Sequence, residues 1–171
     1  GAVLIVILGI FDDIYALPAK PKFLVQIVAA TIAAMSGNCV EFLSNPNIFS
    51  SEPYWELGWF SIPFSVLWIV GITNAVNLMD GLDGLASGIS VSALFAMAIL
   101  GQYSGNVYPA TAALVIGFAV LGFLPFNKYR ARVYMGDCGA QFLGLSIALL
   151  SVATSPQGAY TLESSLFLAV P

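Results

Sequence analysis

The sequence predicts an all-α, polytopic integral membrane bundle, and charge depletion is the first observation behind this prediction. Hydrophobic residues make up 59% of the 171 residues, and only 8% are charged. Soluble domains carry about 25% charged residues, so this chain cannot cover a surface that faces water. A soluble enzyme, a nucleic-acid-binding protein and a disordered segment are therefore excluded. Because the sequence has no His, its chemistry must use carboxylates, amides, Lys and Arg.

The second observation is a series of apolar runs with the length of a membrane helix, which needs about 17–25 residues. We expect complete spans at 22–40, 60–79, 85–101, 107–126 and 139–155, with partial spans at 1–11 and 164–171. Pro, Gly and Asn separate the runs, as is typical of turns. Because the first and last runs are incomplete, we expect residues 1–171 to be one integral membrane domain that is truncated at both ends.

The third observation is the sorting of charge between alternate loops. All five basic residues fall in or at the edge of three loops on one side, 12–21, 80–84 and 127–138. Short loops rich in Lys and Arg mark the cytoplasmic face. Every Asp lies on this side, whereas every Glu lies in the opposite loops, where ordinary solvation explains it. The outer segment 41–59 allows a short hairpin, to which we assign no function.

The first polar motif is the pair Asp12 and Asp13 at the end of the first apolar run. Adjacent carboxylates at a helix C-terminus oppose the helix dipole and repel each other. A bound cation would offset them, as would Lys20 and Lys22, which follow within ten residues. A solvated interfacial loop is the alternative interpretation.

The second motif is the stretch NAVNLMDGLDGLASG at residues 74–88. Its polar residues recur at intervals of three: Asn74, Asn77, Asp80 and Asp83. On a straight helix they would fan over about half of the surface, but Gly81 and Gly84 can break the helix and let them converge. Amide and carboxylate oxygens suit Mg²⁺, which takes one or two carboxylates together with substrate phosphates. A polar helix end that caps itself is the alternative.

The third motif lies at residues 122–144 and combines donors with one acid. The donors suited to phosphate oxygens are Asn127, Lys128, Arg130 and Arg132. Tyr134 offers a flat face to a nucleobase, and Asp137 lies at the start of the next span, where free N–H groups also favour phosphate. The stretch is therefore interpreted as a cradle for an anionic substrate.

Together the three motifs resemble the polyprenyl-phosphate N-acetylhexosamine-1-phosphate transferases of glycosyltransferase family 4, over nearly the whole chain. The resemblance implies transfer of a sugar phosphate from a UDP-N-acetylhexosamine to polyprenyl phosphate, with release of UMP, at the cytoplasmic face of the bacterial plasma membrane. This is the first membrane step of cell-envelope glycan synthesis. It also implies Mg²⁺, or Mn²⁺ in its place, as cofactor. A homodimer is one of the oligomeric states that the sequence leaves open.

The resemblance also assigns roles by motif. Asp137 would ligate the metal with Asn77 as its companion, and Asp12 and Asp13 would position or deprotonate the acceptor phosphate. Catalytic Asp80 and Asp83 would order the nucleotide and the surroundings of the metal. The substrate-binding residues would be Lys20, Lys22, Asn74, Asn127 and Tyr134, with Asn127 on the nucleotide and Tyr134 stacked on uracil.

Two departures from the family pattern separate its branches. The phospho-MurNAc-pentapeptide translocases usually have a Lys soon after the acid pair, where this chain has Ala16 and Leu17, and often a Ser where this chain has Ala140. The departures favour the GlcNAc-1-phosphate branch. The family's His-containing loop is expected after the next span.

Two other functions remain as alternatives. An ion-coupled transporter would place ionisable residues near the bilayer midplane, but here the acids gather at one interface. A CDP-alcohol phosphotransferase is faintly suggested by Asp80-Gly81 and Ala86. Its signature also needs an Arg after the Ala, where this chain has Ser87, and two further Asp residues.

Overall fold

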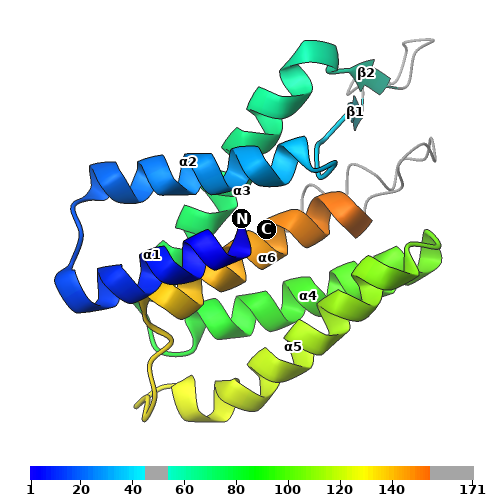
Figure 1. Cartoon of the computed structure of the whole chain (residues 1–171). Helices are drawn as coiled ribbons and strands as arrows, with labels where there is room; N and C mark the ends of the chain where they lie inside the picture. The colour runs from blue at the N-terminus through cyan, green and yellow to red at the C-terminus, as the bar shows by residue number, and fades with distance from the viewer. Residues whose placement is uncertain (45–53, 155–171) are drawn as a thin grey trace.

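The structure is a computed structural model that describes residues 1–44 and 54–154, and helices dominate this part of the chain (Figure 1). The helices are α1 (Ala2–Tyr15), α2 (Ala19–Met35), α3 (Ser61–Met79), α4 (Leu85–Tyr103), α5 (Val107–Asn127) and α6 (Gly136–Thr154). A 3₁₀ turn, η1 (Gly58–Phe60), precedes α3. The predicted all-α bundle is confirmed.

Four helical segments in the described residues are long and apolar enough to cross a membrane. They are Gly58–Met79, Leu85–Tyr103, Val107–Asn127 and Gly136–Thr154. These match four of the five predicted complete spans within a few residues. Residue 155 and the predicted partial span 164–171 lie outside the described residues.

The predicted bounds 22–40 are wrong, because α2 runs over 17 residues from Ala19 to Met35. Pro21 lies in its first turn, where the missing N–H of proline leaves no helical hydrogen bond unmade. The helix ends early because Gly37 adopts a positive φ of 96°. The predicted loop 12–21 also starts too early, since α1 continues to Tyr15.

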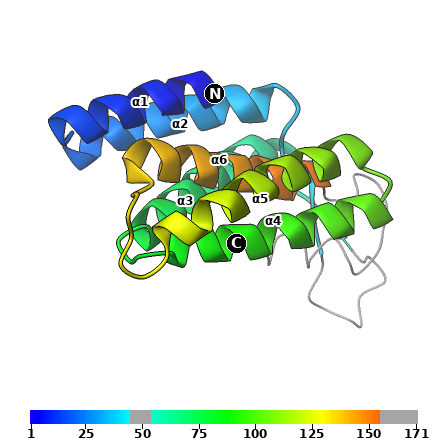
Figure 2. The same cartoon turned by 90° about the horizontal axis from the view of Figure 1, so that it is seen from below.

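Helix α6 occupies the middle of the bundle and packs against α1, α3, α4 and α5 (Figure 2). Half of its apolar span is buried, compared with 17% for α5 on the outside. Two apolar clusters share α6. The first joins α1, α2, α3 and α6 around Ile5, Ala29, Ile69 and Leu145. The second joins α3, α4, α5 and α6 around Val76, Leu94, Ala113 and Ile147.

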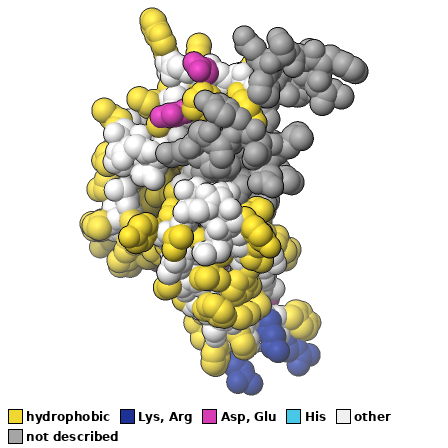
Figure 3. Space-filling view, turned by 90° about the vertical axis from the view of Figure 1, so that its right-hand side faces the viewer, with side chains coloured by type: hydrophobic (Ala, Val, Ile, Leu, Met, Phe, Trp, Pro, Cys, Tyr) yellow, Lys and Arg dark blue, Asp and Glu magenta, His cyan; other side chains and the backbone are white. Residues whose placement is uncertain are grey.

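The two ends of the bundle differ in charge and in structure. The short connections 16–18, 80–84 and 128–135 lie at one end, on the left in Figure 1. At the other end β1 (Phe42–Ser44) pairs antiparallel with β2 (Tyr54–Glu56), in agreement with the short hairpin that the sequence of the outer segment allows. On the face seen in Figure 3, Lys and Arg lie at one end and acidic side chains at the other, whereas every Asp belongs to the end with Lys and Arg. The arrangement agrees with the charge sorting read from the sequence.

Gly9 brings α1 unusually close to α6. A Cβ atom added at Gly9 would overlap the Cα of Cys138 in the first turn of α6. Only glycine leaves space for this approach. The contact sets the end of α1, one turn later, beside the beginning of α6.

Candidate active site

The site is built around Asp12, which is a buried carboxylate in the last turn of α1. The residue is 5% exposed. Its Oδ1 accepts a hydrogen bond from the backbone N of Leu17 at 3.0 Å, and its Oδ2 accepts one from Nε2 of Gln141 at 3.3 Å. Because a buried carboxylate without partners is very costly, these donors satisfy both of its oxygens.

Lys22 supplies the counter-charge and joins three helices. Its Nζ forms ion pairs with Asp12 of α1 and with Asp137 of α6, the latter at 3.1 Å. The two acids are 125 positions apart in the chain but share one ammonium group. The sequence-predicted meeting of the acid pair with Asp137 is therefore present in the structure.

Asp13 faces the beginning of α6. Its Oδ1 accepts from the backbone N of Asp137 at 2.8 Å, and its Oδ2 accepts from the backbone N of Cys138 at 3.2 Å. The first N–H groups of a helix have no partner within the helix, and a carboxylate there also complements the helix dipole. Asp13 thus acts as a cap supplied by another helix and fixes the position of Asp137.

The end of α3 completes the acidic cluster. Asn77 donates from Nδ2 to Oδ1 of Asp137 at 2.6 Å. Asp80 follows the last residue of α3, and burial raises the pKa of its carboxyl, with smaller contributions from the negative charges of Asp137 and Asp13. The structure therefore brings Asp12, Asp13, Asp80 and Asp137 into one electrostatic neighbourhood.

Asp83 and Asn127 bind protein groups in the neighbouring loop. Oδ2 of Asp83 accepts from the backbone N of Ala131 at 3.1 Å. Asn127 is 2% exposed, accepts from the hydroxyl of Ser87 at 2.7 Å and donates to the carbonyl of Val133 at 3.2 Å. These bonds hold segment 128–135 against the start of α4. The predicted contacts of both residues with a nucleotide stay predictions.

The glycine at the start of α4 permits this close fit. Gly84 has a positive φ of 74°, and an added Cβ would lie 3.0 Å from the Cα of Lys128. The helix break predicted between α3 and α4 is thus confirmed. Tyr134 is exposed on the same segment, as are Arg130 and Arg132, so these side chains are accessible to a solute.

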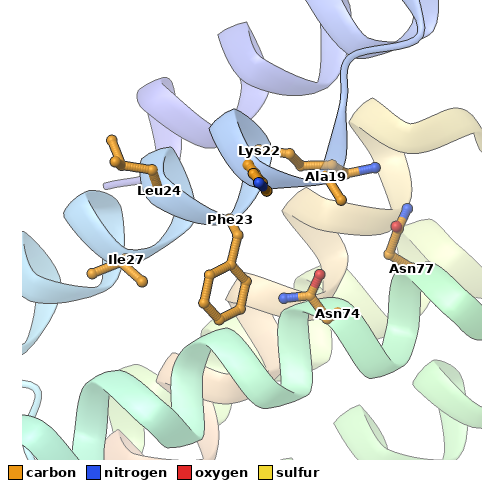
Figure 4. Close-up of a pocket in the computed structure, with 8 residues that line it drawn as sticks. Ala19, Lys22, Phe23, Leu24, Ile27, Asn74 and Asn77 are labelled. Atoms are coloured by element: carbon orange, nitrogen blue, oxygen red, sulfur yellow. The ribbon is translucent and has the colours of Figure 1, made fainter.

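A groove of about 650 Å³ lies between α2 and α3 and ends at the charged cluster (Figure 4). Apolar side chains of α2 line most of it, namely Phe23, Leu24 and Ile27 with Ala19. The polar lining residues are Lys20, Lys22, Asn74 and Asn77. Figure 4 shows Phe23 projecting from α2 towards Asn74 on α3. The groove therefore combines an apolar wall with cationic and amide groups.

Sequence reasoning gave no role to two buried amides, Gln26 and Gln141. Gln26 accepts from Nδ2 of Asn74 at 2.7 Å and donates to Oε1 of Gln141 at 3.2 Å. A signal was available, since each Gln lies four positions after an assigned residue, Lys22 or Asp137, on the same helix face.

The described residues include no group of three or more His, Cys, Asp or Glu side chains placed to hold a metal ion. The oxygen donors nevertheless fit Mg²⁺, which binds through one or two carboxylates and completes its shell with water and substrate phosphates. Asp137, Asp80 and the amide oxygen of Asn77 are such donors. A cation would offset the negative charges of Asp137 and Asp13, which contribute after burial to the raised pKa of Asp80.

Comparison with known proteins shows which family the sequence matches. The family model described as glycosyl transferase family 4 matches residues 1–155. A probable undecaprenyl-phosphate N-acetylglucosaminyl 1-phosphate transferase of Bacillus subtilis is 48% identical over 152 residues, which are 89% of this chain and 42% of the relative.

Two relatives named phospho-N-acetylmuramoyl-pentapeptide-transferase are similar at lower identity. The protein of Listeria monocytogenes is 37% identical over 169 residues, covering 94% of this chain and 52% of the relative. That of Staphylococcus carnosus is 37% identical over 156 residues, covering 90% and 49%. The chain thus spans about half the length of these curated relatives. With the family model matching residues 1–155, the chain belongs to glycosyl transferase family 4.

Proposed function

We propose that this chain forms part of an enzyme that transfers N-acetylhexosamine 1-phosphate, with GlcNAc as the sugar, from a UDP-sugar to polyprenyl phosphate. The observation that carries the proposal is the junction of the apolar groove with the Asp12–Lys22–Asp137 cluster. Family membership supports the reaction class. The 48% identity to the Bacillus subtilis relative supports GlcNAc as the sugar.

The groove has the chemistry of a site for a lipid phosphate. Phe23, Leu24 and Ile27 offer apolar surface to a hydrocarbon chain, and burying such surface contributes about 25 cal/mol per Å². Lys20 and Lys22 provide ammonium groups for phosphate oxygens at the polar end. An acceptor bound in this way would present its phosphate beside Asp137.

The transfer itself needs positioning and charge compensation more than a strong base. An oxygen of the acceptor phosphate forms a bond to the sugar-linked phosphorus, and the bond from that phosphorus to the bridging oxygen breaks. UMP leaves with the electron pair. A phosphate monoester has a second pKa near 6, so at neutral pH it is largely ionised and needs no proton removed.

This chemistry gives Asp12 and Asp13 positioning roles. Asp12 is buried and accepts from Leu17, Gln141 and Lys22, so it orients the ammonium of Lys22. Asp13 fixes the first turn of α6 and with it Asp137. Of the two roles considered for the acid pair, the contacts favour positioning over deprotonation.

Mg²⁺ would be held by Asp137 with Asn77 and Asp80. When bound, it would neutralise the negative charge that grows on the phosphate oxygens of the departing UMP. Tyr134 would stack on uracil, and Asp83 and Asn127 would keep segment 128–135 in place to receive the nucleotide. The Lys and Arg side chains gathered at this end of the bundle support placing the site at the cytoplasmic face of the bacterial membrane.

A second candidate is transfer of phospho-MurNAc-pentapeptide, which the 37% identity to the Listeria monocytogenes relative favours. The two reactions share every step at phosphorus and differ only in the sugar. Ala16, Leu17 and Ala140, which depart from the translocase pattern, favour the GlcNAc donor.

The experiment is a donor comparison in membranes with the full-length protein that contains this chain. UDP-GlcNAc and UDP-MurNAc-pentapeptide are each incubated with polyprenyl phosphate, with Mg²⁺ or with EDTA, and UMP release is measured. We expect release with UDP-GlcNAc that requires both Mg²⁺ and the acceptor. Release only with UDP-MurNAc-pentapeptide would select the second candidate. No release with either donor would reject the transferase and favour the ion-coupled transporter.

A further inference from the structure

We propose that Gln26 and Gln141 are positioning residues that form a buried amide relay between the wall of the groove and the Asp12–Lys22 ion pair. The inference rests on the proposed function and deepens it. Gln26 is 2% exposed and Gln141 is 0% exposed. Two primary amides buried among apolar helices need a reason to be there, because each polar group must find a partner.

The relay connects four helices through three hydrogen bonds. Asn74 of α3 donates to Gln26 of α2 at 2.7 Å, Gln26 donates to Gln141 of α6 at 3.2 Å, and Gln141 donates to Asp12 of α1 at 3.3 Å. Asn74 also donates to the carbonyl of Val70 at 2.8 Å. Every hydrogen bond of the relay therefore points towards the carboxylate.

The chemistry of the last acceptor dictates this direction. An ionised carboxylate accepts but cannot donate, so Gln141 must present its NH₂ group to Asp12. Its oxygen then faces Gln26, which must donate, and the oxygen of Gln26 in turn faces the NH₂ group of Asn74. Aligned amides polarise one another, so the relay strengthens the donor that reaches Asp12.

Both ends of the relay meet the same groove. Asn74 lines it directly, and Asp12 holds Lys22, which also lines it. A phosphate bound at the polar end of the groove would thus lie near the amide of Asn74, where the relay begins. It would also lie near the ammonium of Lys22, which is held by Asp12, where the relay ends. Loss of a relay amide should misplace Lys22 although the Lys22 side chain itself is unchanged.

The test compares relay variants with a matched buried-polar variant on the same helix. Gln141→Leu and Gln26→Leu remove the relay amides singly and together. Ser151→Ala removes a different buried side chain of α6, which accepts from Nε1 of Trp68 at 3.0 Å. For each variant in membranes, kcat, the KM values of both substrates and the thermal unfolding midpoint are measured.

We expect Gln141→Leu to lower kcat at least tenfold with the KM of the UDP-sugar unchanged. The double variant should be no worse than either single one, because residues of one network act non-additively. Ser151→Ala should lose thermal stability and keep its kcat. If kcat follows the unfolding midpoint equally in all variants, or Gln141→Leu keeps its kcat, the positioning role is overturned.

The pH dependence of activity in Gln141→Glu separates the relay from packing, because a residue that only packs would leave this dependence unchanged. The introduced carboxyl can donate to Asp12 only when protonated, and when ionised it repels Asp12. The charged groups around the site are Asp12 and Asp13 on α1, Lys22 on α2, Asp80 after α3 and Asp137 on α6, and they are the same in the wild type. We expect the ratio of variant to wild-type activity to rise as the pH falls from 8 to 6, whereas a flat ratio would contradict the relay.

Failure of the relay and failure of the proposed function are distinguishable. A wild type that releases UMP together with an equally active Gln141→Leu would reject only the relay. A wild type that releases no UMP from either donor would reject the proposed function and the role derived from it.

Discussion

The Nζ atom of Lys22 lies 3.1 Å from Oδ1 of Asp137 while it also pairs with Asp12. One ammonium therefore holds the end of α1, the start of α2 and the start of α6 together at the end of the groove. The pairing gives Lys22 a structural and a functional role, which substitutions can separate.

Lys22→Met should leave Asp12 buried beside only neutral donors. Removing one partner of a largely buried pair leaves the other charge uncompensated, so we expect a loss of about 1–3 kcal/mol in unfolding free energy. Sugar-phosphate transfer should fall at least a hundredfold, as measured by UMP release. Lys20→Met is the stability control, because Lys20 also lines the groove but is exposed and forms no ion pair among the described residues. Equal stability of the two variants would contradict the role of Lys22.

Asp80 should make the folded protein less stable as the pH rises. Burial, followed by the charges of Asp137 and Asp13, raises the pKa of Asp80, so the folded state keeps this proton to higher pH than the unfolded chain does. Stability is then lost as the pH rises from the usual Asp range through the raised pKa. Asp80→Asn should therefore unfold at a higher temperature than the wild type at pH 7.5, with the difference vanishing near pH 4. A difference independent of pH would contradict this account.

Gly9→Ala should separate α1 from α6 and disturb the acid cluster. The added methyl would overlap Cys138, so we expect a loss of about 1–3 kcal/mol and a fall in activity. Gly88→Ala is the matched control in α4, where an added Cβ meets nothing within 4 Å. That control should be neutral or slightly stabilising because Ala favours helices over Gly. Thermal unfolding of both variants in detergent checks the prediction.

Ile27→Trp should narrow the groove that we assign to the lipid acceptor. We expect the KM of polyprenyl phosphate to rise at least fivefold while the KM of the UDP-sugar stays constant. Ile32→Trp on the same helix is the control, since Ile32 is exposed but does not line the groove. Equal effects of both substitutions, or an effect on the UDP-sugar alone, would argue against a lipid in this groove.

The sequence allowed much of this architecture to be predicted because the membrane limits helix length and separates charges. The four long spans and the common end of Asp12, Asp80 and Asp137 follow from that limit. The bounds of α2 could not be predicted in this way, since helix ends depend on local turns such as the one at Gly37. The predicted assembly of the acids around one point is present for Asp12, Asp13, Asp80 and Asp137, whereas Asp83 contacts Ala131.

The individual hydrogen bonds between distant helices were beyond sequence reasoning. Asp13 caps α6 and Gln141 reaches Asp12 because Gly9 lets α1 approach α6, and no periodicity within one helix reveals that approach. The groove likewise is lined by residues of both α2 and α3 and has no signature in either helix alone.

The most direct test of the central claim uses UDP-GlcNAc labelled in the phosphate that is attached to the sugar. The wild-type protein in membranes with polyprenyl phosphate and Mg²⁺ should move this label into the organic phase and release unlabelled UMP in equal amount. Asp137→Asn should move almost none. Transfer of the label at the wild-type rate by Asp137→Asn would contradict the claim that the Lys22–Asp137 cluster is the centre of the reaction.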